Sequence, residues 1–281
     1  MHDTVLKITP PEYMLMRTYI EEHCGIHLEQ DKEYLIESRL SDLAAESGCR
    51  SFQEFHFKAR TDYTGRLKER IIDAITTNET SWFRDKSLWD YLEQVTVPEL
   101  VEKITRTGKA RIWSSAVSTG QEIYSLMMLL DRILQERGLT SFLNRFEIFA
   151  SDISTAALET AMAGRYDAIA MDRGLPPDNR ERYFTVHGRH WEFDPDLRRR
   201  VQFKKFNLQN SFLCFTPFDL ILCRYVSIYF SVPFKRELFS KMASVLTPGG
   251  VLVLGATESL REFSSDFDIS YFNSAVVNTR K

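Results

Sequence analysis

Two short polar stretches, about forty residues apart, hold the side chains of this chain that are best suited to chemistry. Residues 76–85 combine an amide, two carboxylates, several hydroxyls and a guanidinium with two aromatic rings. Residues 118–122, Ser-Thr-Gly-Gln-Glu, lie between a short apolar run and an amphipathic run, which is a strand–turn–helix pattern. Groups of these kinds orient bound small molecules and cofactors. The two stretches therefore predict a cofactor pocket of the nucleotide type, with residues 76–85 as a charged lid.

The sequence after residue 85 contains the elements that must position these stretches. An amphipathic helix is expected over residues 86–103, with an interruption or a new start at Pro98. Strand patterns and helix patterns then alternate, which is typical of a parallel, doubly wound sheet. We expect strands at residues 110–114, 145–150, 201–206, 218–223 and 251–254, and helices at 123–135, 154–163 and 234–245, the last ended by residues 247–250.

Two further segments precede or interrupt this alternation. Residues 9–75 show only helical patterns, with capping boxes at residues 9–12 and 51–54. Residues 183–197 favour a small hairpin inserted in the main fold. We therefore expect an all-helical domain at residues 1–75 and an α/β domain at 76–281, with an inserted β-subdomain at about 183–200.

Polar residues follow four of the expected strands, at the edge where open α/β sheets bind ligands. Glu122 follows the first strand, and Asp152, whose carboxylate suits ribose hydroxyls, follows the second. Asn207 and Leu208 come next, an amide and an apolar side chain that could contact the edge and face of a purine. Residues 224–229, Arg-Tyr-Val-Ser-Ile-Tyr, follow the fourth strand. Because these strand ends share one edge, we expect one pocket.

Each of these residues also has an ordinary structural alternative. Residues 119–122 match a capping box that only starts a helix, and Asp152 could cap the next helix. Asn207 could be a turn residue, and the aromatic residues of 224–229 could belong to the core. The turn around Gly120 is not the GxGxxG fingerprint, which argues against NAD or FAD.

Composition narrows the class of protein. The chain has 281 residues, a formal net charge of −3 and a pI of about 6.1, which argues against a nucleic-acid protein. It has no apolar run of the ~20 residues that a membrane span needs, and no signal-peptide pattern at its N-terminus. Its four cysteines form no CxxC pair, and its histidine pairs lack partners at zinc-site spacing. We therefore expect a cytoplasmic protein without a metal site or membrane insertion.

The chain resembles the CheR family, the chemotaxis receptor glutamate methyltransferases. The resemblance covers nearly the whole chain and includes residues 34–40 of the helical part. The other matching segments are residues 78–84, 118–122, 150–154, 207–208, 218–224 and 228–230. This set is specific in its order and spacing. It implies an α/β fold with a Rossmann-like methyltransferase sheet and a small inserted β-subdomain, preceded by an all-helical N-terminal domain that recognises the substrate.

The resemblance also implies a reaction and its residues. The cofactor would be S-adenosylmethionine, and its contacts would be Asn78, Thr80, Arg84, Glu122, Asp152, Asn207, Leu208, Arg224 and Tyr225. Arg84 and Tyr229 match residues near the reacting methyl group, which implies catalytic roles. The substrate would be glutamate side chains in the cytoplasmic domain of methyl-accepting chemotaxis receptors, with S-adenosylhomocysteine as the second product. In some members the β-subdomain docks a C-terminal receptor peptide, and the sequence leaves this open here.

Two departures from the family pattern leave alternatives. The family usually has Arg-Asn where this chain has Arg224 and Tyr225, and an acidic residue and a proline where it has Gln121 and Ile123. We expect the Tyr225 ring to pack near the adenine. One alternative is a degenerate member that binds cofactor and partners with little transfer. Another is a nucleic-acid methyltransferase, which is disfavoured because Cys-Arg-Tyr-Val replaces the Asp/Asn-Pro-Pro-aromatic motif after the fourth strand.

Overall fold

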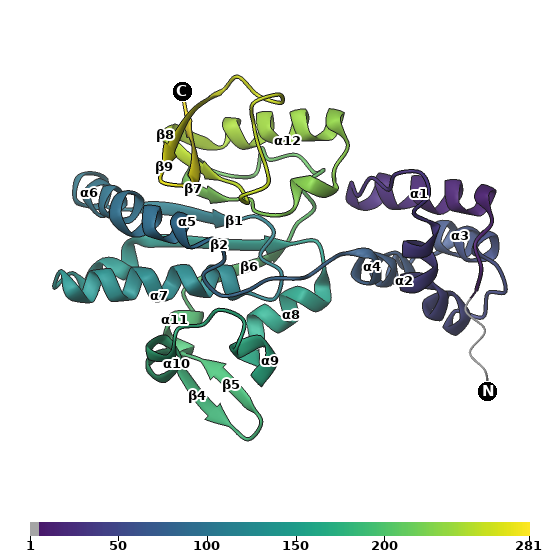
Figure 1. Ribbon diagram of the computed structural model, residues 1–281, viewed down its shortest axis with the longest axis horizontal. Coiled ribbons are helices and arrows are strands. Elements are labelled where there is room, and N and C mark those ends of the chain that lie inside the picture. Colours follow the sequence, from purple (N-terminus) through teal and green to yellow (C-terminus); the bar gives the residue numbers. More distant parts are fainter. Residues whose placement is uncertain (1–5) are drawn as a thin grey trace.

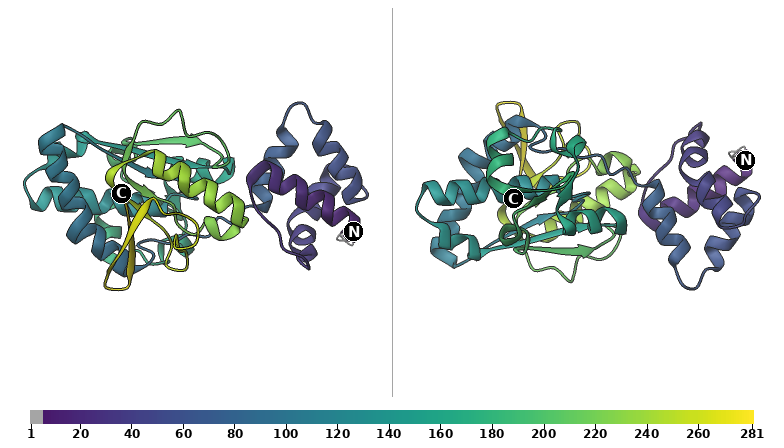
Figure 2. Two further views of the ribbon diagram at one scale, coloured as in Figure 1. Left: turned by 90° about the horizontal axis from the view of Figure 1, so that it is seen from above. Right: turned by 90° about the horizontal axis from the view of Figure 1, so that it is seen from below.

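The computed structural model describes residues 6–281, and its first part is a bundle of four helices. These are α1 (Pro10–Cys24), α2 (Glu33–Glu46), α3 (Phe52–Thr61) and α4 (Arg66–Ile75). They pack around their own apolar core and form a separate lobe in Figures 1 and 2. The N-terminal stretch in which we expect no signal peptide lies partly outside the described residues.

Both segments predicted to be capping boxes begin helices of this lobe, but only the first box has the bond from its N-cap N–H to the glutamate, because Glu54 accepts the N–H of Arg50 at 2.7 Å. The Glu12 carboxylate accepts hydrogen bonds from the backbone N–H of Thr9 at 2.9 Å and from its hydroxyl at 2.7 Å. Ser51 accepts a bond from the N–H of Glu54 at 3.1 Å. These bonds satisfy polar groups at the helix ends that no intrahelical partner can reach.

A seven-stranded sheet forms the second part, in the order β6-β2-β1-β7-β8-β10-β9. Five strands are parallel, as expected: β1 (Ala110–Ser114), β2 (Phe146–Asp152), β6 (Val201–Lys205), β7 (Phe218–Leu222) and β8 (Leu246–Val253). The chain passes from β1 outward to β2 and β6, and then returns to β7 on the other side of β1. The topological switch point, where such sheets bind ligands, therefore lies between β1 and β7.

Helices cover the two faces of this sheet. Ile112 of β1 faces a core formed with α6 (Val97–Thr107) and α7 (Gln121–Glu136), whereas its neighbour Trp113 faces the core under α12 (Val232–Ser244). Successive side chains on a strand point to opposite faces, so a strand covered on both sides is apolar throughout. Helix α8 (Thr155–Ala163) lies between β2 and β6 in the sequence and packs against both strands.

The C-terminal part of the sheet was not predicted. Strands β9 (Phe267–Phe272) and β10 (Ala275–Arg280) are antiparallel, so the sheet is mixed and not purely parallel. Residues 247–250 do not end the preceding helix, because α12 ends at Ser244 and β8 already begins at Leu246. The break expected at Pro98 is a π-helical turn, η1 (Leu92–Thr96), between α5 (Lys86–Tyr91) and α6. Proline has no N–H to continue the regular ladder.

The inserted hairpin is present as β4 (Phe184–His187) and β5 (His190–Phe193). A third strand, β3 (Arg165–Tyr166), pairs with β5 and completes a small antiparallel sheet. The short helices α9 (Ala168–Met171), α10 (Pro177–Tyr183) and α11 (Pro195–Arg198) surround it, and η2 (Thr140–Arg145) precedes β2. Within residues 6–281, no helix is long and apolar enough to span a membrane.

Candidate active site

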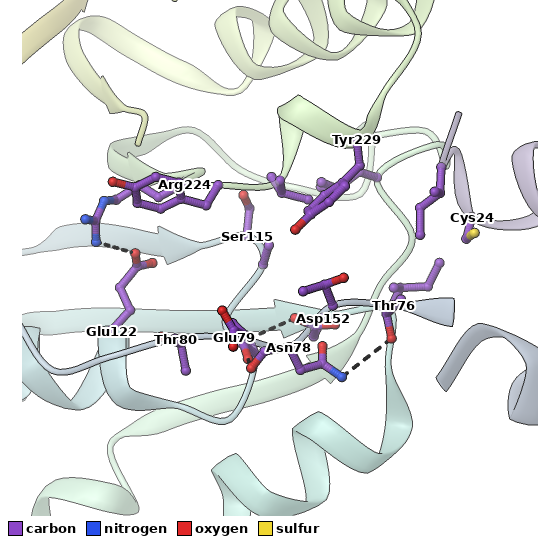
Figure 3. Close-up of a pocket in the computed structure, with 18 of the residues that line it drawn as sticks. Cys24, Thr76, Asn78, Glu79, Thr80, Ser115, Glu122, Asp152, Arg224 and Tyr229 are labelled. Carbon is purple, nitrogen blue, oxygen red and sulfur yellow. Dashed lines mark hydrogen bonds and ion pairs between the residues drawn. The ribbon is translucent and has the colours of Figure 1, made fainter. Parts of the chain in front are cut away.

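A cavity lies at the carboxyl ends of the parallel strands, beside the switch point. Its empty space, counted with the open mouth, is about 900 Å³, and its lining combines apolar side chains with a few polar and charged groups. Residues 76–80 and Arg84 cross one side, and the end of α1 reaches it from the helical lobe. All ten predicted site residues line it: Asn78, Thr80, Arg84, Glu122, Asp152, Asn207, Leu208, Arg224, Tyr225 and Tyr229. Figure 3 labels several of them, among them Asn78, Glu122, Asp152 and Tyr229.

Asp152 occupies the end of β2 with its carboxylate buried. One oxygen accepts the N–H of Ser118 at 2.8 Å and the other accepts the N–H of Ser154 at 2.9 Å. Burial raises the pKa of Asp152 above its ordinary value, although these N–H groups oppose the rise. Ser154 itself caps α8, because its hydroxyl accepts the N–H of Ala157 at 3.1 Å. The alternative in which Asp152 only caps this helix is therefore wrong.

Glu122 does not close a capping box either. Helix α7 begins at Gln121 with Gly120 as its N-cap, so Thr119 lies outside the capping position. The Glu122 carboxylate instead accepts the Ser114 hydroxyl at 2.8 Å and pairs with Arg224. Gly120 has φ of +98°, and a Cβ there would lie 2.9 Å from the hydroxyl of Tyr166. This turn therefore requires glycine for its conformation and for its contact with the β-subdomain.

Arg224 joins two carboxylates at the cavity wall. Its side chain is 2% exposed, and it contacts Glu122 at 2.9 Å and Asp85 at 2.8 Å. It also donates to the backbone carbonyl of Arg84 at 2.6 Å. Burial by itself would raise the pKa of Asp85, but the hydrogen bonds from Tyr225 and Arg224 outweigh it and hold that pKa below its ordinary value. Asp85 was not predicted as a site residue, although it directly follows Arg84.

Tyr225 supports Arg84 in an unusual backbone conformation. The Arg84 guanidinium carbon lies 3.4 Å from the centroid of the Tyr225 ring, and the Tyr225 hydroxyl donates to Asp85 at 2.6 Å. Tyr225 has φ of +56°, a region that asparagine adopts more readily than tyrosine. The asparagine that the resemblance implies at this position would therefore suit this conformation. The predicted packing of the ring near the adenine gains no support here, since Arg84 covers one face and Asp85 holds the hydroxyl.

Trp82 anchors the lid to the β-subdomain. Trp82 is buried, donates from its ring to the carbonyl of Ala170 at 2.9 Å, and packs edge-on against Tyr166 and Phe184. The carbonyl of Asn78 accepts the Ser118 hydroxyl at 2.9 Å. Residues 76–85 are therefore fixed both to the turn after β1 and to the β-subdomain.

Asn207 has the turn role that the sequence left open. Its side-chain oxygen accepts the N–H of Gln209 at 2.9 Å, and its amide donates to the His23 carbonyl at 2.8 Å. It therefore connects the loop after β6 to the end of α1 while it lines the cavity with Leu208. Cys24 and Ile26 also line the cavity, and no local pattern could have predicted that a loop of the helical lobe would do so.

Tyr229 lies in the short turn η3 (Ser227–Tyr229), and its ring reaches into the cavity in Figure 3. Its carbonyl accepts the N–H of His27 at 2.8 Å, and the next residue, Phe230, forms a β-bridge with Ile26. The helical lobe therefore contacts the loop that carries Tyr229. Within the described part of the chain, no group of three or more His, Cys, Asp or Glu is placed to hold a metal ion.

A mixed, Rossmann-like sheet with a cavity at its switch point, walled by Asp152 and Glu122, is the architecture of a protein that binds a small-molecule ligand or cofactor there. Family comparison identifies the class. Residues 78–276 match the "CheR methyltransferase, SAM binding domain", and residues 11–76 match the "CheR methyltransferase, all-alpha domain". The chain belongs to the CheR methyltransferase family, and it is an S-adenosylmethionine-dependent methyltransferase.

Relatives resemble the chain over nearly their full length. "Chemotaxis protein methyltransferase 1" of Pseudomonas aeruginosa is 38% identical over 271 residues, which are 96% of this chain and 98% of the relative. "Chemotaxis protein methyltransferase" of Vibrio anguillarum is 36% identical over 275 residues, 98% of each chain. "Chemotaxis protein methyltransferase Cher2" of Pseudomonas putida is 35% identical over 271 residues, with 96% and 98% covered.

Proposed function

We propose that the chain transfers the methyl group of S-adenosylmethionine to glutamate side chains in the cytoplasmic domain of methyl-accepting chemotaxis receptors. The observation that carries this proposal is the state of Arg84. Its guanidinium lies on the cavity wall against Tyr225, and its neighbour Asp85 pairs with Arg224 instead. Among residues 6–281, Arg84 forms no ion pair with a carboxylate. A cation held beside a cofactor cavity without a carboxylate partner suits an acceptor that is itself a carboxylate.

The cavity has one group of residues that suits the adenosine part of the cofactor and another that suits its methionine part. Asp152 uses each oxygen for one N–H, and each oxygen keeps a lone pair for a ribose hydroxyl. Leu208 and Ile26 offer apolar contact for the adenine beside Asn207. Glu122 and Arg224, with Asn78 and Thr80 on the lid, would hold the charged methionine part. The domains at residues 1–75 and 76–281 would both contribute to this pocket.

The chemistry asks little of the protein beyond positioning. The cofactor supplies a methyl group bound to a positively charged sulfur. The acceptor carboxylate is ionised near pH 7 and needs no general base. Its oxygen forms the new C–O bond while the C–S bond breaks and the electron pair stays on sulfur, so both charges disappear. Alignment and exclusion of water therefore favour the reaction.

Arg84 and Tyr229 would act at the acceptor. Arg84, stacked on Tyr225, would orient the glutamate carboxylate through a single hydrogen bond or ion contact. Two hydrogen bonds from the guanidinium would hold the carboxylate more tightly and reduce its nucleophilicity. Tyr229 would line the path of the methyl group. Both side chains line the same cavity and come from segments that are anchored on other parts of the fold.

The helical lobe supplies positive charge for an acidic receptor helix. Arg60 is exposed on α3 and Arg66 is exposed on α4, where Lys68 is half-buried. Arg60 contacts Glu22 at 3.7 Å with both side chains more than half exposed, a pair of little energetic weight. The positive charge of these three side chains, together called the basic surface, would attract the acidic helical bundle of a receptor.

The β-subdomain offers a second contact for the receptor. Strand β4 lies at the edge of its three-stranded sheet, and Thr185, Val186 and His187 are exposed on it. An extended peptide from a receptor's C-terminus could pair with this edge by strand addition. The proposed partner places the enzyme in the cytoplasm.

The test of this function combines binding and transfer. Calorimetry measures binding of S-adenosylhomocysteine, and mass spectrometry detects methyl esters on receptor cytoplasmic domains. We expect both binding and transfer, with transfer lost when the acceptor glutamates are replaced by alanine. Binding without transfer to receptor domains from the same organism would support the degenerate alternative, to which the departure at Tyr225 points.

The basic surface has its own test. Reversal of Arg60, Arg66 and Lys68 to Glu should slow receptor methylation by at least tenfold at low salt, because it removes the attraction for the acidic bundle. The affinity for S-adenosylhomocysteine should not change, and the wild-type rate should fall as salt rises. Normal methylation by the triple variant at low salt would assign recognition to another surface.

A further inference from the structure

A buried carboxylate outside the predicted site holds the loop that carries the site residues after β7. Glu258, in the loop after β8, is 7% exposed and accepts four hydrogen bonds. One oxygen accepts the N–H groups of Tyr225 at 2.6 Å and Gly255 at 2.8 Å. The other accepts both the N–H and the hydroxyl of Ser227, at 2.8 Å and 2.6 Å. Three of these four donors belong to the loop at residues 224–229.

The surroundings of Glu258 are shaped for this contact. A Cβ on Gly255 would lie 2.9 Å from the Glu258 carboxylate and 2.9 Å from two carbons of the Tyr225 ring. Only a residue without a side chain allows the carboxylate and the ring to approach so closely. The N–H of Tyr225 is held where this residue has its positive φ. Glu258 therefore stabilises a backbone conformation that tyrosine rarely adopts.

The bonds of Glu258 reach the site at two points. Through the Tyr225 backbone they place the ring on which the Arg84 guanidinium stacks. Through Ser227 they fix the start of the turn that ends at Tyr229. The helical lobe holds the other end of this turn, since the His27 N–H donates to the Tyr229 carbonyl. The turn is therefore held from both sides.

We propose that Glu258 is a positioning residue for methyl transfer, which acts by fixing residues 225–227 beneath Arg84 and Tyr229. This proposal rests on the roles of Arg84 and Tyr229 in the proposed function. Glu258 forms no ion pair among the described residues, so its interactions are directed to the two loops and not to a charged partner elsewhere. A buried charge that is satisfied only by loop N–H groups and a hydroxyl fixes the conformation of that loop.

Glutamine at this position tests the acceptor function with almost no change of shape. An amide NH₂ group would meet the Ser227 N–H in one orientation and the Tyr225 and Gly255 N–H groups in the other. Two donors cannot bond to each other, so Glu258→Gln must lose part of the network in either orientation. The matched control is Asp219→Asn. Asp219 is also buried and accepts several hydrogen bonds, but it lies at the amino end of β7, opposite the end that leads to residues 224–229.

The experiment measures kcat, KM for receptor, the dissociation constant of S-adenosylhomocysteine and the fraction of folded enzyme. We expect Glu258→Gln to lower kcat per folded molecule at least tenfold while cofactor affinity changes less than threefold. Asp219→Asn should lower thermal stability without changing kcat per folded molecule. If Glu258→Gln loses activity only in proportion to its folded fraction, as the control does, Glu258 is merely structural and the proposal is overturned.

A milder variant decides the case if Glu258→Gln does not fold. Ser227→Ala removes only the hydroxyl donor, and it should lower kcat about threefold with unchanged cofactor affinity. Unchanged turnover in that variant would overturn the proposal. The wild-type enzyme separates this outcome from a failure of the proposed function, because a wild type that methylates no receptor contradicts the function itself.

Discussion

A network of buried charged side chains lies at each end of strand β7. The two networks differ in whether side chains beside them remain free to contact a ligand. At the amino end, Asp219 accepts bonds from Lys103, from the Arg111 backbone at 2.9 Å and from the Thr247 hydroxyl at 3.0 Å. These groups come from α6, β1 and β8, so the network connects elements that pack against β7. It is a structural network.

At the carboxyl end, Arg224 pairs with Glu122 and Asp85. The segments that carry Asp85 and Arg224 also carry side chains that are free to contact a ligand. The Arg84 guanidinium stacks on Tyr225 without a carboxylate partner among the described residues, and Tyr229 reaches into the cavity. Both networks are buried and charged, so burial of charge does not by itself mark a functional site. The carboxyl-end network differs because it holds unpaired groups against a cavity.

Among the variants that test this comparison, loss of Arg84 should have the largest effect, a fall in turnover. Arg84→Ala removes the cation that would orient the acceptor, and misplacement of a reacting group costs on the order of 10²-fold in rate. Its side chain contributes a cation–π contact worth about 0.5–1 kcal/mol at such a site, so the Tm should change little. Turnover and thermal melting of the same preparation check this. A large fall in Tm with normal turnover per folded molecule would place Arg84 in the structural class.

Loss of Asp152 should weaken cofactor binding. Asp152→Ala leaves the ribose hydroxyls and two backbone N–H groups without their acceptor, a cost of about 1–3 kcal/mol. Calorimetry with S-adenosylhomocysteine measures the change. Unchanged affinity would remove Asp152 from the binding site.

The pH dependence of binding sharpens this result. Burial raises the pKa of Asp152, so its carboxylate is protonated at a higher pH than that of an exposed aspartate. The ionised form accepts the ribose bonds, and affinity should therefore be full above the raised pKa and fall as the pH drops through it. Titration of the wild type and Asp152→Ala at matched pH values tests the assignment, because the variant should lack this fall.

Removal of charge at the amino end of β7 should affect stability alone. Asp219→Asn leaves Lys103 without its carboxylate and sets an NH₂ group near N–H donors, for a loss of about 1–3 kcal/mol. Lys103 is 29% exposed, so solvent moderates the cost. Denaturant unfolding measures the loss, and kcat per folded molecule should stay constant. A fall in kcat without a fall in stability would abolish the distinction between the two networks.

Replacement of Tyr225 should give the smallest effect. Tyr225→Asn relieves the backbone at positive φ but removes the ring under Arg84 and the hydroxyl bond to Asp85. Because these changes oppose each other, cofactor affinity should stay within tenfold, or about 1.4 kcal/mol. The control Tyr225→Phe keeps the ring and removes only the hydroxyl. A loss greater than tenfold would show that this tyrosine is an adapted contact of the cofactor site.

The sequence by itself determined the five parallel strands and the residues at their ends. Alternation of strand and helix patterns predicts a parallel sheet, and the carboxyl ends of parallel strands meet at one edge whatever their order. For that reason the sequence alone predicts Glu122, Asp152, Asn207 and Arg224 around one pocket, and all four line the same cavity.

The tertiary structure decided which partners these groups have. Arg224 and Glu122 are 102 residues apart, and Tyr225 and Glu258 are 33 apart, so no local pattern records these pairs. The antiparallel strands β9 and β10 and the contacts of Ile26 likewise depend on where distant segments pack. Local sequence determines the type and face of an element, whereas hydrogen-bond partners and the conformation of Tyr225 depend on the surrounding fold, because each requires groups that only folding brings together.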